Sequence, residues 1–188
     1  MQPYCLLFTL VLLSARLEAQ LPVSRERHHT VILENQYLRL LEGRIPMHDT
    51  TPAHIHAANS VVIFLSHSTF GIQVVGDEPV ITTVNPGDLK YVAYGDKPVT
   101  HIVWNQTPPL FHFYVVETAK KPVTSSLDLT DTQPLHLGPV PYARLLVAIT
   151  GTVSAGGAAL TPNQYRFFPP KTPIDLKGRA HCILLELR

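Results

Sequence analysis

The sequence predicts an all-β protein, built as a sandwich or a barrel. Its apolar runs are short, and turn-forming Gly, Pro, Asn and Asp separate them at regular spacing. No window between residues 31 and 118 shows the 3.6-residue periodicity of an amphipathic helix. The 188 residues include 17 prolines and only 10 glycines, a balance that favours stiff turns and strand ends over long helices.

Each predicted strand is a run of aliphatic, aromatic or β-branched residues that ends at turn-forming residues. The clearest turn is Asn85-Pro86-Gly87-Asp88, which lies between two such runs. Two histidines, His54 and His56, precede the most apolar of the runs. In chain order, the strands expected before residue 119 span 31–33, 37–45, 61–65, 71–75, 80–84, 89–94, 101–105 and 111–117.

The second part of the chain is β-rich as well. Residues 119–135 are polar and rich in Ser, Thr and Pro, which predicts a linker. Beyond the linker, strands are expected at 142–150, 165–168 and 180–187. The stretch 84–92 resembles 160–168, a weak internal repeat. We therefore expect one barrel over 31–118 and a shorter, degenerate second copy over 136–188.

The N-terminus carries features of export. Residues 1–19 read as a secretory signal peptide, with an apolar core at 6–13 and the small residue Ala19 before the expected cut at Gln20. That core is too short to span a bilayer. Residues 20–30 are expected to form a polar arm, whose adjacent His28 and His29 read as surface or turn residues. The expected location is the periplasm or the extracellular space.

Composition excludes several classes of function. The net charge of +1 leaves no basic footprint for nucleic acid and no membrane contact beyond the signal peptide. Cys5 lies in the expected signal peptide, so Cys182 is left alone in an apolar run and reads as a buried, inert thiol. No nucleophile elbow, phosphate loop, paired-cysteine motif or dinucleotide fingerprint occurs.

His54 and His56 are the first candidates for chemistry. Side chains alternate along a strand, so both imidazoles point to one face and Ile55 points to the other. Imidazole is a ligand for zinc, copper, iron and nickel. At this point two interpretations stay open: two ligands of a metal site inside a barrel, or two solvated histidines on an exposed edge.

Further motifs give the chain a resemblance to a known family. The His54-x-His56 pair, the turn at residues 86–88 and the spacing from His101 to Asn105 together resemble the two motifs of the cupins. The chain is similar to small exported bacterial cupins over residues 31–118, and over 136–188 in outline, as in a degenerate bicupin. The resemblance implies a double-stranded β-helix, or jelly-roll barrel, with His54, His56 and His101 as metal ligands.

The sequence departs from the cupin pattern at one ligand. The position of the family's glutamate falls on Ser60 or Val61, and Ser60 shares the strand parity of the two histidines. Three neutral imidazoles would leave a bound divalent ion its full charge. Asn105 near His101, and His112 in the strand 111–117, are further candidates for the pocket. The ligand types suit Fe, Zn, Ni and Mn alike.

The resulting hypothesis is an exported cupin that binds a divalent metal and acts on or binds a small organic molecule, with oxygenase activity as one option. The alternative is a non-catalytic ligand-binding or structural cupin that has lost its metal chemistry. Barrel edges need covering, so a homodimer is also expected.

Overall fold

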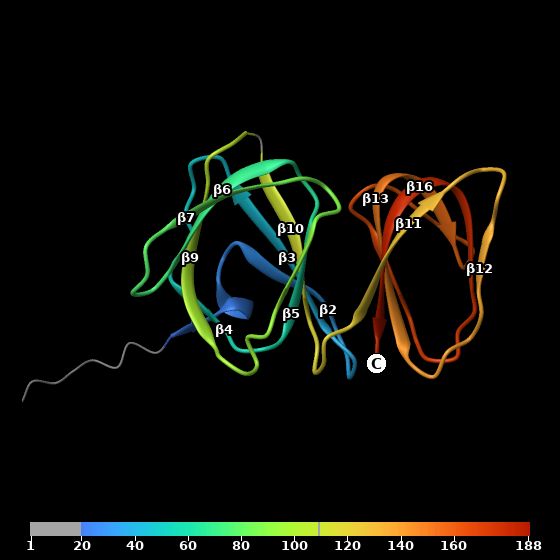
Figure 1. Ribbon diagram of the computed structural model, residues 1–188, viewed down its shortest axis with the longest axis horizontal. Helices are drawn as coiled ribbons and strands as arrows, with labels where there is room; N and C mark the ends of the chain where they lie inside the picture. The colour runs from blue at the N-terminus through green and yellow to red at the C-terminus, as the bar shows by residue number, and fades with distance from the viewer. Residues whose placement is uncertain (1–19, 109) are drawn as a thin grey trace, which may run out of the picture.

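The computed structural model describes residues 20–108 and 110–188. The expected signal peptide, 1–19, lies outside the described residues. Two β-rich units lie side by side, the first from the N-terminal half and the second from the C-terminal half (Figure 1). No helix in these two ranges is long and apolar enough to cross a membrane. The all-β class predicted from the turn spacing is confirmed.

The first unit consists of two five-stranded sheets. All strand pairs are antiparallel except the parallel pair β1–β4. One sheet contains, in spatial order, β1 (Leu21–Pro22), β4 (His54–His56), β9 (Val99–Asn105), β6 (Ser68–Val74) and β7 (Val80–Val84). The other contains β2 (His29–Glu34), β3 (Arg39–Pro46), β10 (Leu110–Glu117), β5 (Ser60–Phe64) and β8 (Leu89–Val92). A single turn of 3-10 helix, η1 (Val23–Arg25), joins β1 to the segment before β2.

Strand alternation divides the side chains of β10 between two faces. Phe111, Phe113 and Val115 point into the first unit and belong to its apolar core. Tyr114 and Val116 point the other way, into the cluster that packs against the second unit. The apolar character of β10 on both faces follows, because this strand is covered on each side.

The second unit is a six-stranded sheet around a packed core of aliphatic side chains and one phenylalanine. Its strands are β11 (Val123–Leu129), β12 (Leu135–Leu137), β13 (Ala143–Ala155), β14 (Ala158–Leu160), β15 (Tyr165–Phe168) and β16 (Ile174–Leu187). β13 pairs with β15, β14 and β16. These pairings match those of β5 and β6 with β8, β7, β10 and β9 in the first unit. The shared pairing plan agrees with the internal repeat seen in the sequence.

The two units share an apolar interface. Side chains from β3, β5 and β10 pack against side chains from β13 and β16 in one buried cluster. Two hydrogen bonds cross the interface: the Tyr114 hydroxyl donates to the Asn163 carbonyl at 2.6 Å, and the Tyr165 hydroxyl donates to the Ile32 carbonyl at 2.9 Å. The units are therefore held by packing and by specific polar contacts.

Two boundaries expected from the sequence are wrong. The predicted linker, 119–135, contains strand β11, which pairs with β16 from Val123 to Leu129. Leu127 and Leu129 alternate with polar residues and pack on the second core. This segment is therefore a half-buried strand, although its Ser- and Thr-rich composition is typical of a linker. The arm 20–30 is also integrated, since Leu21 and Pro22 pair with His54 and Ile55 of β4.

Candidate metal centre

Four histidines from three strands meet inside the first unit. His54 and His56 lie on β4, and His101 faces His54 directly on the neighbouring strand β9. His29 begins β2 on the opposite sheet. All four are buried, and His54 is completely inaccessible to solvent. The exposed-edge interpretation of the H-x-H pair is thereby excluded, because both imidazoles point into the unit.

The histidine rings approach one another closely. His29, His54 and His56 each place one ring nitrogen within 4.8 Å of the others. Nε2 of His101 lies 3.2 Å from Nε2 of His54. The ring centroids of His56 and His101 are 4.9 Å apart, so His101 belongs to the same cluster. We call these four residues the histidine cluster.

Hydrogen bonds fix the orientation of two rings. Nδ1 of His54 lies 2.9 Å from the Pro52 carbonyl, which only accepts, so Nδ1 carries the proton and Nε2 is free to bind. Nδ1 of His29 donates to the Glu26 carboxylate at 2.6 Å. A histidine that ligates a metal through one nitrogen commonly donates the other N–H to a carboxylate or carbonyl, which is the arrangement of His29 and His54.

The environment keeps three imidazoles of the cluster, those of His54, His56 and His101, neutral. Burial, followed by repulsion from neighbouring imidazoles, lowers the pKa of His56 to about 2 and that of His101 to about 3. Burial also lowers the pKa of His54. Burial would raise the pKa of Glu26, but hydrogen bonds from His29 and His28 outweigh it and lower this pKa to about 2. Neutral imidazoles beside an ionised carboxylate are the protonation states that metal binding requires.

The donor set fits a transition metal. Two imidazole nitrogens on one metal at about 2.1 Å lie roughly 3.0 to 3.4 Å apart, and the His54–His101 separation of 3.2 Å falls in this range. Among the described residues, Nδ1 of His56 and Nδ1 of His101 are buried without a hydrogen-bond partner. Buried polar atoms without partners are costly, and an ion bound at Nδ1 of His56 would satisfy that atom. His101 faces His54 through Nε2, so its Nδ1 is not the atom that such an ion would bind.

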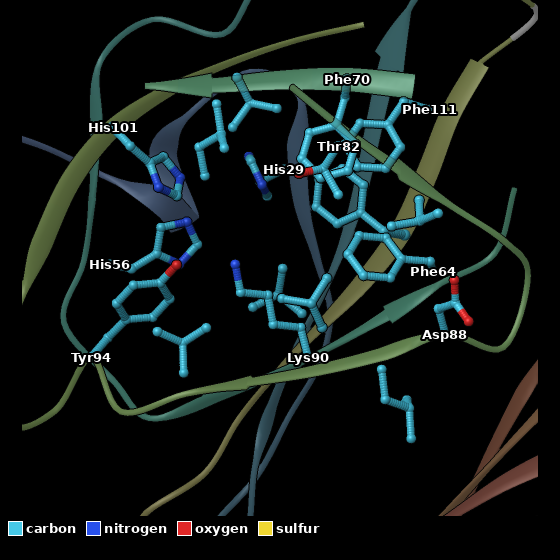
Figure 2. A pocket seen from close by; sticks show the side chains of 18 residues that line it. His29, His56, Phe64, Phe70, Thr82, Asp88, Lys90, Tyr94, His101 and Phe111 are labelled. Carbon is cyan, nitrogen blue, oxygen red and sulfur yellow. The ribbon is translucent and has the colours of Figure 1, made fainter. Parts of the chain in front are cut away.

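A cavity of about 360 Å³ opens beside the cluster. His29, His56 and His101 line one side, and Phe64, Phe70 and Phe111 line another (Figure 2). Phe113 also lines the cavity, beside His29. Tyr94 lies against His56, with ring centroids 5.0 Å apart. The cavity lies between the edge strands β7 and β8, which contribute lining residues but do not pair with each other. A small ligand in it would contact imidazoles at one end and aromatic rings at the other.

Three further residues proposed from the sequence, Ser60, Asn105 and His112, make contacts outside the histidine cluster. Ser60 is buried, but its hydroxyl donates to the Ala58 carbonyl at 2.8 Å and does not line the cavity. Asn105 is structural: its amide donates to the Ile45 carbonyl and its oxygen accepts from Thr107 N–H. His112 points away from the cluster and lies 2.8 Å from Glu42. Its place in β10 puts it on the face opposite Phe111 and Phe113.

Two residues of the centre, His29 and Glu26, were not predicted from the sequence. His28 and His29 were expected at the surface, yet both are buried, and Glu26 between the two rings is 1% exposed. The Glu26-x-x-His29 spacing was the available clue, since a carboxylate commonly orients a metal-binding histidine. This clue could not be used, because the residues near Glu26 do not indicate that the N-terminal arm pairs with β4.

Comparison with solved structures identifies the fold. YhhW from Escherichia coli aligns over 85% of this chain and 89% of its own, with a TM-score of 0.63 and 12% identity. A cupin 2 conserved barrel domain protein from Leptotrichia buccalis covers 85% and 88%, with a TM-score of 0.54 and 11% identity. A salicylate 1,2-dioxygenase from Pseudaminobacter salicylatoxidans covers 88% and 78%, with a TM-score of 0.60 and 11% identity.

No family model matches the sequence, and the curated proteins contain no match either. The structural neighbours nevertheless extend over both units of this chain. The chain shares the fold of these structures, which include a cupin barrel domain protein, so the jelly-roll fold implied by the His54-x-His56 pair and the turn at 86–88 is confirmed. At these identities the likeness defines the fold and leaves the chemistry to the site itself.

Proposed function

We propose that the protein binds a divalent transition metal through the histidine cluster and binds or converts a small organic molecule in the adjacent cavity. The observation that carries the proposal is the convergence of four buried imidazoles, two of which have a ring nitrogen, Nδ1, without a partner among the described residues. Packing four imidazoles together without an ion leaves buried polar atoms unsatisfied. Iron, zinc, nickel and manganese all fit this donor set.

The proposed ligand set extends the one expected from the sequence. His54, His56 and His101 were the expected ligands, and His29 now joins them because its ring nitrogen lies within 4.8 Å of those of His54 and His56. Glu26 holds His29 from behind and brings a negative charge next to the site without entering it. Imidazole ligands bring no negative charge of their own, so a bound divalent ion, offset only in part by the Glu26 carboxylate behind His29, would attract an anionic ligand.

When bound, such an ion supplies Lewis-acid chemistry, or dioxygen chemistry if it is iron. The protein's own residues then position the ligand. Phe64, Phe70 and Phe111 exclude water from the far end of the cavity. Burial raises the pKa of Tyr94, so its phenol stays protonated beside His56 as a hydrogen-bond donor. The dioxygenase among the structural neighbours supports the oxygenase option.

Metal analysis tests the proposal directly. Protein purified without chelators should contain close to one equivalent of a transition metal, or take it up from Fe²⁺, Zn²⁺, Ni²⁺ or Mn²⁺. His54→Ala should abolish uptake, whereas His136→Ala, a change at an exposed histidine outside the cluster, should not. Less than about a tenth of an equivalent after loading would overturn the proposal. Metal uptake by the His29→Ala and His101→Ala proteins, measured separately, shows whether the ion binds His29, His101 or both.

Oxygenase activity has its own readout. Fe²⁺-loaded protein should consume dioxygen when candidate organic substrates are added, and zinc-loaded protein should not.

The alternative is a ligand-binding or structural cupin without metal chemistry. It would be supported if His54→Ala and His101→Ala proteins stayed folded and bound their ligand as tightly as the original.

Location and assembly are further proposals. Export followed by cleavage before Gln20 would give a secreted protein whose N-terminal residue is Gln20, which sequencing of the exported product checks. A homodimer would cover edge strands such as β7, where Val80 and Ile81 are exposed. Light scattering across a range of concentrations distinguishes the dimer from a monomer.

A further inference from the structure

We infer that the cavity accepts a small organic carboxylate with a compact, ring-sized apolar body, and that Lys90 binds the carboxylate group. The inference rests on the proposed function, because it names the class of molecule that occupies the cavity beside the histidine cluster. It depends on one cation, on the charges around that cation and on the apolar wall opposite.

Lys90 reaches into the cavity from β8. The residue pairs with Val62 of β5, which lines the cavity too, so both side chains lie on the inner face of the sheet. Figure 2 shows the Lys90 side chain rising from the strand with its ammonium group directed into the open space. Lys90 is exposed to solvent, so its charge lies at the mouth of the cavity, on the face that strand register gives it.

The ammonium group lacks a counter-ion within the described residues. The ion pairs formed there do not include Lys90. Asp88 is the one acidic residue among those that line the cavity. Its Oδ2 accepts a hydrogen bond from the Asn85 N–H at 2.8 Å, which commits it to the turn before β8. An anion that entered the cavity would supply the missing partner.

The histidine cluster does not neutralise Lys90. An imidazole carries no negative charge in either of its protonation states, so the histidines that line the cavity cannot pair with the Lys90 ammonium group. Glu26, the nearest buried carboxylate of the cluster, already accepts from His28 and His29. Lys90 is the one lysine or arginine among the residues that line the cavity, and a bound divalent ion would add to its positive charge.

The wall opposite the cluster selects the rest of the ligand. Phe70 and Phe111 stack with ring centroids 4.3 Å apart and planes 15° apart, and Phe64 lies parallel to Phe111 at 6.0 Å. These rings offer an apolar surface on which a flat or compact body can pack. A volume of about 360 Å³ is at the small end for ligand sites, which favours a molecule of one ring over a larger one.

The test compares carboxylates with neutral amides of the same shape. Isothermal titration calorimetry measures binding of benzoate against benzamide, phenylacetate against phenylacetamide, and hexanoate against hexanamide, each to metal-loaded and metal-depleted protein. At least one carboxylate should bind about tenfold or more tightly than its amide. Lys90→Met should reduce that preference to less than about threefold, and Lys90→Arg should retain part of it.

Controls separate this inference from the proposed function. Lys97→Met, at an exposed lysine outside the cavity, should bind the carboxylates as the original does. Metal content is measured in each variant and should be unchanged by Lys90→Met. If the protein takes up no metal but shows a Lys90-dependent preference, the proposed function fails and the inference stands. It is overturned if no carboxylate binds better than its amide, or if Lys90→Met retains the preference.

Discussion

Glu26 accepts a hydrogen bond from Nδ1 of His29 at 2.6 Å, and its carboxylate also accepts from the backbone N–H and the ring of His28. The carboxylate therefore fixes which nitrogen of His29 carries a proton and leaves Nε2 for a metal. A residue that was expected in a polar N-terminal arm thus orients one histidine of the candidate metal centre. Its role is one of positioning, since it does not line the cavity itself.

Glu26→Gln should weaken metal binding without abolishing it. The amide removes the negative charge and one acceptor oxygen, so the His29 ring loses its fixed orientation. Loss of such a partner costs about 10- to 100-fold in metal affinity, which competition with a chromogenic chelator measures. Glu34→Gln, at the exposed end of β2, the strand that begins at His29, is the matched control. Equal affinities for the two variants would show that Glu26 does not position His29.

Gly43→Ala should disturb the candidate centre from the middle of the sheet. Gly43 pairs with His29 on one side and with Phe113 on the other, and the rings of these neighbours meet at 5.5 Å between centroids. A Cβ at Gly43 would lie 2.2 Å from Cζ of Phe113, so the aromatic ring must move. We expect a loss of about 1 to 3 kcal/mol in unfolding free energy, together with weaker metal binding.

Gly138→Ala is the matched control, because a Cβ there would meet no atom within 4 Å. Urea denaturation and metal competition on both variants check the expectation. A Gly43→Ala protein as stable as Gly138→Ala would contradict the tight row of His29, Gly43 and Phe113.

Tyr114→Phe should weaken the association of the two units. The Tyr114 hydroxyl donates to the Asn163 carbonyl across the buried interface. Its removal leaves that carbonyl without this partner, at a cost of about 1 to 2 kcal/mol in unfolding free energy. Tyr37→Phe serves as control, since Tyr37 packs on the same cluster and no hydrogen bond of its hydroxyl occurs within the described residues. Equal stability of the two variants would contradict the role given to this bond.

Cys182 should react slowly with thiol reagents in the folded protein. It lies within the second core, and burial, followed by the charge of Asp128, raises the pKa of its thiol to about 11. A protonated and inaccessible thiol is a poor nucleophile. In protein that begins at Gln20, a colorimetric disulfide reagent at pH 8 should label Cys182 at least about 100-fold more slowly than in urea. Rapid labelling of the folded protein would show that the second unit opens readily.

The sequence predicted those ligands of the centre that strand alternation and motif spacing indicate, namely His54, His56 and His101. The period of two along a strand placed His54 and His56 on one face, and the resemblance to cupin motifs brought in His101. His29 could not be found this way, because its approach to β4 depends on how the first strands enter the barrel. The same limit explains the linker, where Ser and Thr concealed the alternation of Leu127 and Leu129.

Parity alone also proved insufficient for Ser60. The side chain is buried as its position suggested, yet its hydroxyl is used by the Ala58 carbonyl two residues away. Ser, Thr and Asn side chains often satisfy nearby backbone groups. Predicting which partner a buried hydroxyl chooses requires the local backbone path, which a pattern of residue types does not contain.

The two units follow one pairing plan, but they differ in the continuity of their long strands. In the second unit the paired strands β13 and β16 run unbroken through 13 and 14 residues, and side chains fill the core that their sheet surrounds. In the first unit the corresponding strands are divided into β5 and β6, and into β9 and β10, so two separate sheets diverge around a hollow. The interruption of two strands thus distinguishes the first unit, which contains a cavity, from the second, whose core is filled. Changing the length of the loops at those interruptions would change the volume of the cavity without altering its histidines.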